Sequence, residues 1–229
     1  GRGILGRIRD IAKKYNSYSD KWNGIGVLHT SANRVGALEA GFVPGEGGLN
    51  TSEIIEGTKN KKIKLLWLLG YDEEIIEKDS SAFIIYQGHH GDFGAESADL
   101  ILPGSAYTEK NGTYINTEGR VQRTYAAVPA PGNAKEDWKI IRAFSEYIDK
   151  TLPYNNISQL RSYLENINKN FVIENSLLKA ETTDIGDIKV KLKNASIKPL
   201  KMNYFMTCPI SRSSETMAKC SIAKSKLGM

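Results

Sequence analysis

The sequence predicts an α/β fold with a doubly wound, mainly parallel sheet and a C-terminal extension of helix and irregular structure. Two continuous apolar runs, residues 63–69 and 82–87, each end at a glycine, and residues 100–102 form a third. Continuous apolar strands are typical of a parallel sheet that helices cover on both faces. We therefore expect an α/β domain over residues 1–153, and an extension with a helix, a lysine-rich loop and a docking helix over 154–229.

Composition limits the classes of protein that this chain can represent. Its 229 residues, 40% hydrophobic and 25% charged, are enough for one substantial core. No apolar run approaches the roughly 20 residues that cross a bilayer, so we expect membrane association only through partners. The net charge of +5 is modest, and the lysines gather at 59–64, 189–201 and 219–226. We interpret these clusters as solvated surface and expect no nucleic-acid partner.

The first residues predict an amphipathic helix. Ile4, Ile8, Ile11 and Tyr15 share one face, with basic residues around it. A glycine turn into a helix normally follows a strand, so we expect that the preceding β-element has been lost, falls outside this sequence or lies on another chain. This would leave an open sheet edge for a partner. The alternative is a mitochondrial presequence, against which Asp10 argues.

The next segments connect the first helix to the sheet. We expect a helix at residues 31–40, ended by Gly41, and a surface connection at 46–62 with a short helix at 52–56. Residues 72–79 are acidic, but the spacing of their carboxylates is irregular and predicts a solvated face rather than a metal site. His29 is expected to be a core or interface residue.

The loop at residues 88–94 follows a strand at the end where open α/β sheets place ligands. His89, His90 and Asp92 could bind zinc or relay protons. A closed zinc site needs a fourth ligand, which no neighbouring cluster offers. We therefore favour a packing or interface role and leave metal binding or acid–base work as the alternative.

The stretch at residues 98–122 predicts a strand, a turn and a hairpin. Pro103 ends the strand because it has no N–H to donate. Gly112 and Gly119 flank a β-prone run and permit the turns of a hairpin.

The remaining chain predicts three helices and one uncertain segment. Asn133, with Glu136 three residues later, is expected to cap a helix, and a second helix spans 157–168. Residues 176–198 are polar and leave room for one edge strand. The helix at 212–226 is expected to dock on another surface.

Two cysteines, Cys208 and Cys220, indicate a reduced compartment rather than a disulfide framework. An iron–sulfur cluster needs four protein ligands, usually thiolates. We therefore expect that this chain cannot hold a cluster alone.

The hairpin stretch resembles a loop of the molybdopterin oxidoreductase family. The matching residues, in the family's order, are Glu109, Gly112, Thr113, Asn116, Glu118, Gly119, Arg120 and Gln122. Together with residues 86–92, 136–143 and 204–220, they make the chain similar to the C-terminal part of the largest (seventy-five-kilodalton) iron–sulfur subunits of mitochondrial respiratory complex I, NADH:ubiquinone oxidoreductase.

The resemblance implies a non-redox structural domain in the NADH-oxidising module of the peripheral arm, on the matrix side of the mitochondrial inner membrane. It implies no catalytic, cofactor-binding or metal-binding residue here, with the iron–sulfur clusters on the N-terminal part of the subunit, carried by a separate chain. Two alternatives remain: a cofactor-binding fragment of an active molybdopterin enzyme, and a basic α/β binding module. Metal analysis of the pure protein distinguishes the active molybdopterin enzyme from the structural domain. A salt-dependent nucleic-acid titration tests the basic binding module.

Overall fold

The structure is a computed structural model that describes residues 2–19, 22–78, 81–175, 196 and 203–227. Its contacts divide the chain into two compact units. We call Phe42–Gly112, Arg123–Tyr163 and Lys201–Met229 the sheet unit, and Gly1–Gly41, Thr113–Gln122 and Leu164–Leu200 the hairpin unit. The predicted division at residue 153 stays a prediction.

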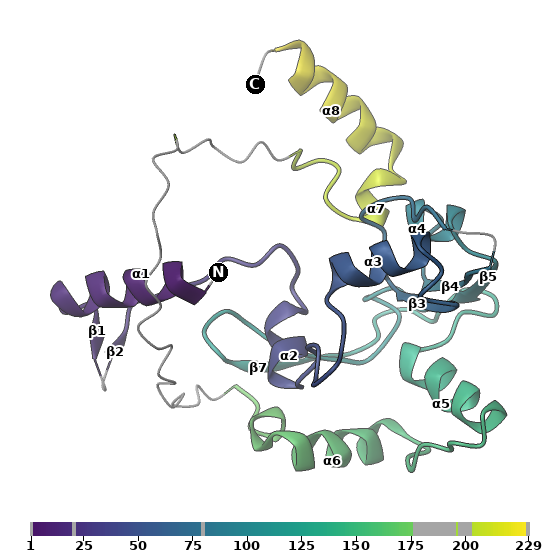
Figure 1. The fold of residues 1–229 in the computed structure, drawn as a ribbon, viewed down its shortest axis with the longest axis horizontal. Coiled ribbons are helices and arrows are strands. Elements are labelled where there is room, and N and C mark those ends of the chain that lie inside the picture. The colour runs from purple at the N-terminus through teal and green to yellow at the C-terminus, as the bar shows by residue number, and fades with distance from the viewer. Residues whose placement is uncertain (1, 20–21, 79–80, 176–195, 197–202, 228–229) are drawn as a thin grey trace. The chain divides into compact units, whose positions relative to one another are not determined.

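The sheet unit is built on three parallel strands, β3 (Leu65–Leu69), β4 (Phe83–Gly88) and β5 (Leu100–Pro103), in the order β3-β4-β5. Helix α3 (Thr51–Lys59) lies on one face, where Ile55 packs against the core around Ile84. Helix α5 (Asp137–Tyr147) covers the other face (Figure 1). There Phe144 meets Trp67 edge to face, with ring centroids 4.7 Å apart. The parallel α/β architecture is confirmed.

Burial differs between the centre and the edges of this sheet. In β4, Ile84, Ile85 and Tyr86 are buried, whereas Leu65 of β3 and Ile101 of β5 are 55% and 53% exposed. The prediction that all three apolar runs are buried on both faces is therefore wrong for the outer two. In a three-stranded sheet both outer strands are edges, and the described residues cover them incompletely.

Several helix boundaries differ from those predicted. Helix α3 has nine residues, because Asn50 and Glu53 form a reciprocal capping box that starts it earlier. The expected cap at Asn133 is wrong: α5 begins at Asp137, after Glu136. The Glu136 carboxylate instead accepts hydrogen bonds from the Asn111 N–H and the Trp138 indole.

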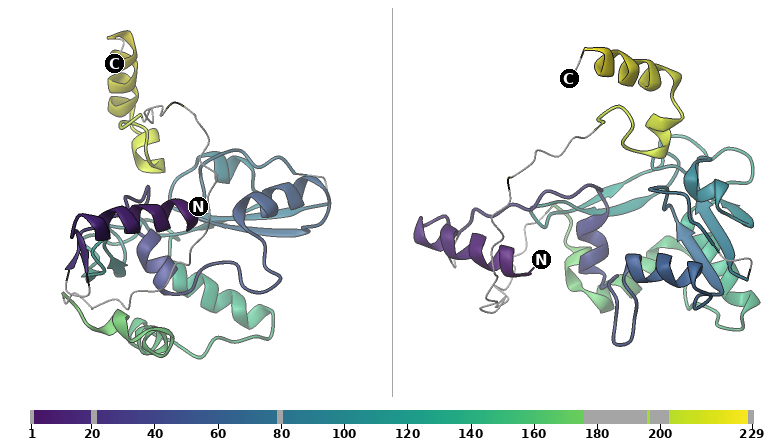
Figure 2. Two further views of the ribbon diagram at one scale, coloured as in Figure 1. Left: turned by 60° about the vertical axis from the view of Figure 1, so that its left-hand side comes forward. Right: turned by 45° about the horizontal axis from the view of Figure 1, so that its top comes forward.

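The C-terminal helix is two helices rather than one. A short helix α7 (Pro209–Arg212) precedes α8 (Glu215–Lys226), whose N-cap Ser214 accepts a hydrogen bond from the Met217 N–H. Figure 2 shows α8 extending away from α7. The edge strand considered within residues 176–198 lies outside the described residues.

The hairpin unit is organised around β6 (Gly112–Ile115) and β7 (Val121–Thr124), which form the predicted hairpin. Gly119 has φ +86° in the turn, where a residue with a side chain would be strained. Ile115, Val121 and Phe171 make the core.

Helices surround this hairpin core. Val35 of α2 (Arg34–Glu39) and Leu164 of α6 (Ile157–Ile167) pack against it, and Phe171 comes from a 3₁₀ turn, η1 (Lys169–Val172). Helix α1 (Arg2–Lys14) precedes a two-residue strand pair, β1 (Tyr18–Ser19) and β2 (Trp22–Asn23). Among the described helices, none is long and apolar enough to cross a membrane.

Candidate functional site at the carboxyl end of the sheet

The carboxyl ends of β3 and β4 carry a buried pair, Asp72 and Tyr86. The Tyr86 hydroxyl donates to Asp72 Oδ2 at 2.6 Å and lies 3.1 Å from the His90 carbonyl oxygen. Asp72 Oδ1 accepts the Gly94 N–H at 3.1 Å. Both carboxylate oxygens of Asp72, which is 3% exposed, are therefore satisfied within the chain.

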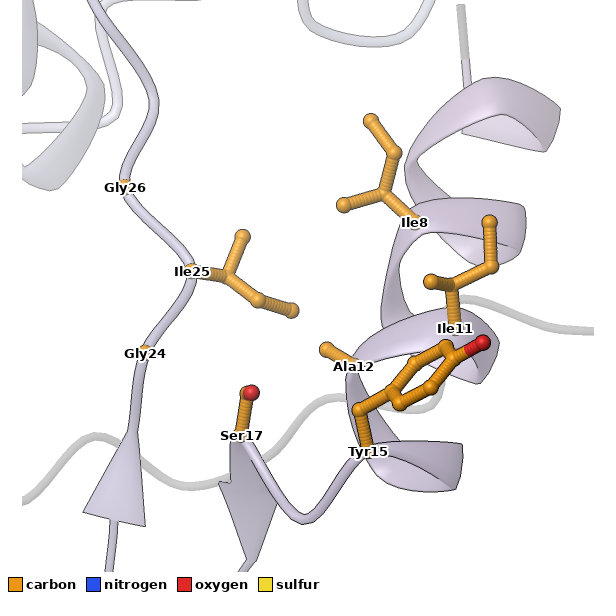
Figure 3. Close-up of a pocket in the computed structure, with 8 residues that line it drawn as sticks. All are labelled: Ile8, Ile11, Ala12, Tyr15, Ser17, Gly24, Ile25 and Gly26. Atoms are coloured by element: carbon orange, nitrogen blue, oxygen red, sulfur yellow. The ribbon is translucent and has the colours of Figure 1, made fainter.

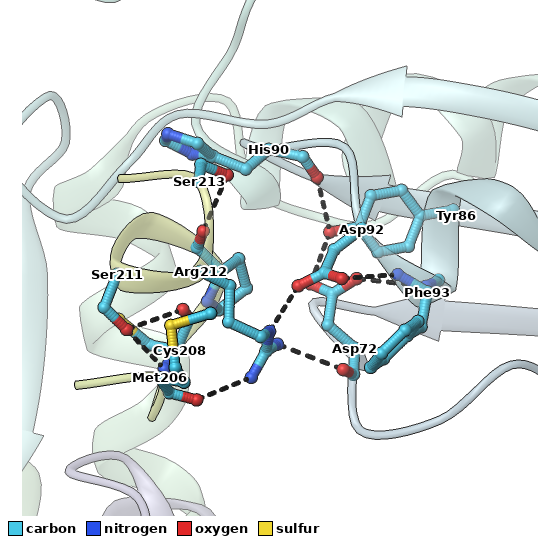
Figure 4. Close-up of polar contacts among 12 residues, drawn as sticks. Asp72, Tyr86, His90, Asp92, Phe93, Met206, Cys208, Ser211, Arg212 and Ser213 are labelled. Atoms are coloured by element: carbon cyan, nitrogen blue, oxygen red, sulfur yellow. Dashed lines mark hydrogen bonds and ion pairs between the residues drawn. The ribbon is translucent and has the colours of Figure 1, made fainter. Parts of the chain in front are cut away.

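Arg212 reaches the same place from α7, 140 residues further along the chain (Figure 4). Its Nε donates to Asp92 Oδ2 at 2.5 Å, and its Nη2 donates to the Asp72 carbonyl oxygen at 3.0 Å. The guanidinium carbon lies 5.9 Å from the centre of the Phe93 ring. We call this group, Asp72, Tyr86, Asp92, Phe93 and Arg212, the crevice cluster.

The chemistry of the crevice cluster is that of a closed hydrogen-bond network. Burial, and then the hydrogen bond to Asp72, raise the pKa of Tyr86, so its phenol stays protonated and donates. Asp92 also accepts the Phe93 N–H at 2.9 Å through its second oxygen. Each carboxylate in the cluster is thus already engaged, and none is poised as a general base.

The two histidines lie beside this cluster. Their Nδ1 atoms are 2.7 Å apart, and their rings meet edge to face. Burial lowers the pKa of His89, and the neighbouring His90 and Lys110 lower it further. Across the described ranges, no group of three His, Cys, Asp or Glu side chains is arranged to hold a metal ion. The packing role of this loop stays a prediction.

A second polar group lies at the carboxyl end of β4, on the α5 side. Gln87, fully buried, donates from Nε2 to Asp137 Oδ1 at 3.0 Å, and Lys110 forms an ion pair with the same carboxylate. A side chain added at Gly104 would bring its Cβ to 3.0 Å from that oxygen. This group is therefore tightly packed and ties the strand end to the start of α5.

Three polar residues of the predicted family loop, Glu109, Asn116 and Arg120, form hydrogen bonds within the chain. Glu109 Oε2 accepts the Ala106 N–H, and Asn116 Oδ1 accepts the N–H groups of Glu118 and Arg120. The Arg120 guanidinium donates to the Asn175 carbonyl oxygen within the hairpin unit. Asn116 thus holds the hairpin turn, while Glu109 and Arg120 bond backbone outside the turn.

The hairpin unit has an apolar hollow of about 300 Å³, open to solvent, between α1 and the chain after β2 (Figure 3). Ile8, Ile11, Tyr15 and Ile25 line it. Ile11 of α1 is 59% exposed, and Tyr15, which directly follows the helix, is 70% exposed. The hollow offers apolar contact rather than catalytic groups.

Sequence reasoning does not find the two residues that define the crevice cluster. The sequence places Asp72 in an acidic segment that is expected to be solvated, and Glu73, Glu74 and Glu77 of that segment are indeed exposed. It places Arg212 at the start of the last helix, with no sign of its partner. One available signal is the position of Asp72, just after a strand that ends in glycine, where ligand-contacting residues gather in α/β sheets.

Comparison with known proteins identifies the fold family. The molybdopterin oxidoreductase family model matches residues 1–147, more than half of the chain. The chain belongs to the molybdopterin oxidoreductase family. A second family model, which describes the C-terminal region of the G subunit of NADH-ubiquinone oxidoreductase, matches residues 172–220.

Curated relatives within this family match nearly the whole chain. It is 45% identical to the NADH-ubiquinone oxidoreductase 75 kDa subunit of Reclinomonas americana, over 96% of this chain and 32% of the relative. It is 48% identical to the mitochondrial NADH-ubiquinone oxidoreductase 78 kDa subunit of Candida albicans, over 93% of this chain and 30% of that relative. It is 41% identical to the G subunit of NADH-quinone oxidoreductase from Rickettsia typhi, over 98% of this chain and 31% of that relative. The predicted resemblance is confirmed, and the chain spans about a third of the length of these relatives.

The residues of this molybdopterin oxidoreductase domain do not fit the pterin cofactor at the crevice. Molybdopterin carries a phosphate, which favours N–H donors and basic groups. The crevice presents Asp72 and Asp92, and its arginine is already engaged with Asp92. Cys208 and Cys220, both free, also fall short of the four ligands of an iron–sulfur cluster.

Proposed function

We propose that this chain is a non-redox structural part of the NADH-oxidising module of complex I. In this proposal it corresponds to the C-terminal part of the 75 kDa subunit and supports electron transfer from NADH to ubiquinone. In this proposal the iron–sulfur clusters belong to the N-terminal part of the subunit. The similarity to 75 kDa, 78 kDa and G subunits over more than nine-tenths of the chain supports this assignment.

One observation carries the non-redox part of the proposal: the closed state of the crevice cluster. The place where a doubly wound sheet would receive a ligand holds an ion pair between Arg212 and Asp92 instead. With 13% and 19% side-chain exposure for Asp92 and Arg212, the pair is largely shielded from water. A domain whose ligand site is filled by its own chain is suited to holding structure.

The proposed partner of closest contact is the cluster-bearing N-terminal part of the same subunit. Two features favour a large partner surface: the exposed apolar face of α1, and the incompletely covered outer strands of the sheet. Each exposes several apolar side chains together, and grouped apolar surface of this kind marks interaction sites. Other peripheral-arm subunits are further proposed contacts, and membrane association is indirect.

The proposed location is the matrix side of the mitochondrial inner membrane. The relatives from Candida albicans and Neurospora crassa are named as mitochondrial, which supports it. The Rickettsia relatives are bacterial proteins, so this location depends on the source of the chain.

Co-expression of the chain with the cluster-bearing partner tests the proposal. We expect a stoichiometric complex in which iron is found on the partner and the isolated chain binds neither iron nor molybdenum. A control chain with Ile8→Asp and Ile11→Asp on α1 should fold but bind the partner weakly. Stoichiometric molybdenum on the isolated chain would favour the active-enzyme alternative, and lack of any complex with the partner would contradict the assembly role.

A further inference from the structure

We propose that Asp92, Phe93 and the carbonyl of Asp72 form a guanidinium-binding site, which the chain occupies with its own Arg212. Through this contact the C-terminal segment at residues 203–213 acts as a latch that closes the crevice. The proposal goes beyond the assembly role and does not depend on it. It concerns a contact within the sheet unit alone.

The receptor side is fixed by contacts that do not involve Arg212. Asp92 Oδ1 accepts the Phe93 N–H, which leaves Oδ2 directed at the latch. The Asp72 side chain is held by the Tyr86 hydroxyl and the Gly94 N–H, and this anchors the peptide whose carbonyl oxygen accepts Arg212. A site that is organised before its ligand arrives loses little entropy on binding.

The charge of the receptor favours a cation. The Asp92 carboxylate pairs with the guanidinium, and the carbonyl oxygen of Asp72 adds a second acceptor. Asp92 is 13% exposed, so removing the cation would leave a shielded carboxylate without its ion pair. Such unpaired charges are costly in partly buried positions.

The geometry favours a guanidinium over an ammonium group. The Arg212 Nε donates to the Asp92 carboxylate, and its Nη2 donates to the Asp72 carbonyl oxygen. Its Nη1 lies 3.5 Å from the Met206 carbonyl oxygen of the latch itself. The planar group also lies over the Phe93 ring. A lysine ammonium is a point charge that cannot serve these directions together or stack on the ring.

The latch is built to present this arginine. Cys208 precedes α7, and Ser211 Oγ donates to the Cys208 carbonyl oxygen at 2.9 Å, while the Cys208 N–H reaches Ser211 Oγ at 3.0 Å. The Arg212 N–H in turn donates to the Cys208 carbonyl oxygen at 2.9 Å. This short turn therefore fixes the backbone from which Arg212 enters the crevice (Figure 4).

Hydrogen exchange on the full chain tests the latch. In Arg212→Ala we expect the amides of Arg212 and Ser213 in the latch to exchange at least about tenfold faster, as loss of a charged hydrogen bond allows. Arg212→Lys should behave in the same way. The control is Arg142→Ala, which also removes three polar contacts, to Tyr154, Glu146 and Asn155, and should leave these amides unchanged.

Chemical rescue tests the guanidinium chemistry. Ethylguanidinium, binding on the order of millimolar, should refill the preformed site in Arg212→Ala and shift the amide NMR signals of Phe93 and Gly94, whereas ethylammonium should not. Ethylguanidinium should have no such effect on Asp92→Asn, because this variant lacks the carboxylate charge of the receptor.

Three results would overturn the proposal: unchanged amide exchange in Arg212→Ala, wild-type protection of the latch amides in Arg212→Lys, or an equal response of Arg212→Ala to ethylguanidinium and ethylammonium. If Arg212→Ala does not fold, Arg212→Lys and Asp92→Asn replace it, since both keep the size of the side chain. Faster exchange of the latch amides in both variants supports the proposal, and wild-type exchange in both overturns it.

Discussion

The crevice of the sheet unit and the hollow of the hairpin unit are both places where a binding partner would be expected, yet the chain treats them differently. The crevice is polar, and one arginine from the same chain satisfies it. The hollow is apolar, and its lining residues Ile8 and Ile11 remain 43% and 59% exposed.

The difference follows from the kind of interaction each surface needs. A polar site is closed by a few directed hydrogen bonds, which a single side chain can supply. An apolar face gains about 25 cal/mol of free energy for each Å² that is buried, so covering it needs a large complementary surface. The comparison therefore separates contacts that the chain completes by itself from those for which we propose a partner.

The largest effect is expected from a core substitution in the sheet unit. Ile84 is fully buried in β4, so Ile84→Ala should lower the free energy of unfolding by about 2–5 kcal/mol. Ile11→Ala on the exposed face of α1 should change it by no more than about 0.5 kcal/mol in the isolated chain. Urea denaturation measures both. A large loss of unfolding free energy in Ile11→Ala would mean that the chain already covers this face of α1. It would contradict the difference drawn between the crevice and the hollow.

A smaller effect is expected from the hydroxyl of Tyr86. Tyr86→Phe removes the donor to Asp72 and should cost about 1–3 kcal/mol, because a buried carboxylate oxygen loses its partner. Tyr147→Phe is the matched control, since Tyr147 is 88% exposed. Thermal unfolding of both variants gives the comparison, and equal melting temperatures would contradict the closed network.

The smallest effect is expected at Glu136, and it depends on pH. Burial raises the pKa of Glu136, but the hydrogen bonds from Lys139 and the Asn111 N–H outweigh it and hold the pKa below its usual value. A carboxyl whose folded pKa is lowered contributes stability above its unfolded pKa of about 4.3, and this is lost as the pH falls through the folded pKa.

Glu136→Gln should therefore be less stable than the wild type by up to about 1 kcal/mol at neutral pH, with the difference vanishing in acid. Stability measured against pH tests this, with the exposed Glu165→Gln of α6 as control. A difference that persists below about pH 3 would show that the loss comes from packing rather than from charge.

The parts of the fold that can be predicted from sequence are those with local causes. The apolar runs at 63–69 and 82–87 contain the strands Leu65–Leu69 and Phe83–Gly88 because the runs are continuous, and Gly119 makes its turn because it can adopt a positive φ. The N-terminal helix follows from its 3.6-residue periodicity.

The parts that sequence does not predict depend on distant residues. Arg212 meets Asp92 across 120 positions, and no local pattern marks either as a partner of the other. Glu136 does not complete a cap with Asn133 because its carboxylate bonds the Asn111 N–H and Trp138 instead. The edge position of β5 depends on strand order, which three short apolar runs do not specify.

The ring of Tyr86 lies between two glycines that leave no room for any side chain. A Cβ at Gly88 would stand 2.2 Å from the Tyr86 hydroxyl, and one at Gly94 would stand 2.4 Å from the Tyr71 carbonyl oxygen and 2.6 Å from the ring. Even alanine at either position would push the ring away from Asp72. The mutational tolerance of this region is therefore set by two residues that make no side-chain contact of their own, and a missense change in either codon would act on the whole crevice at once.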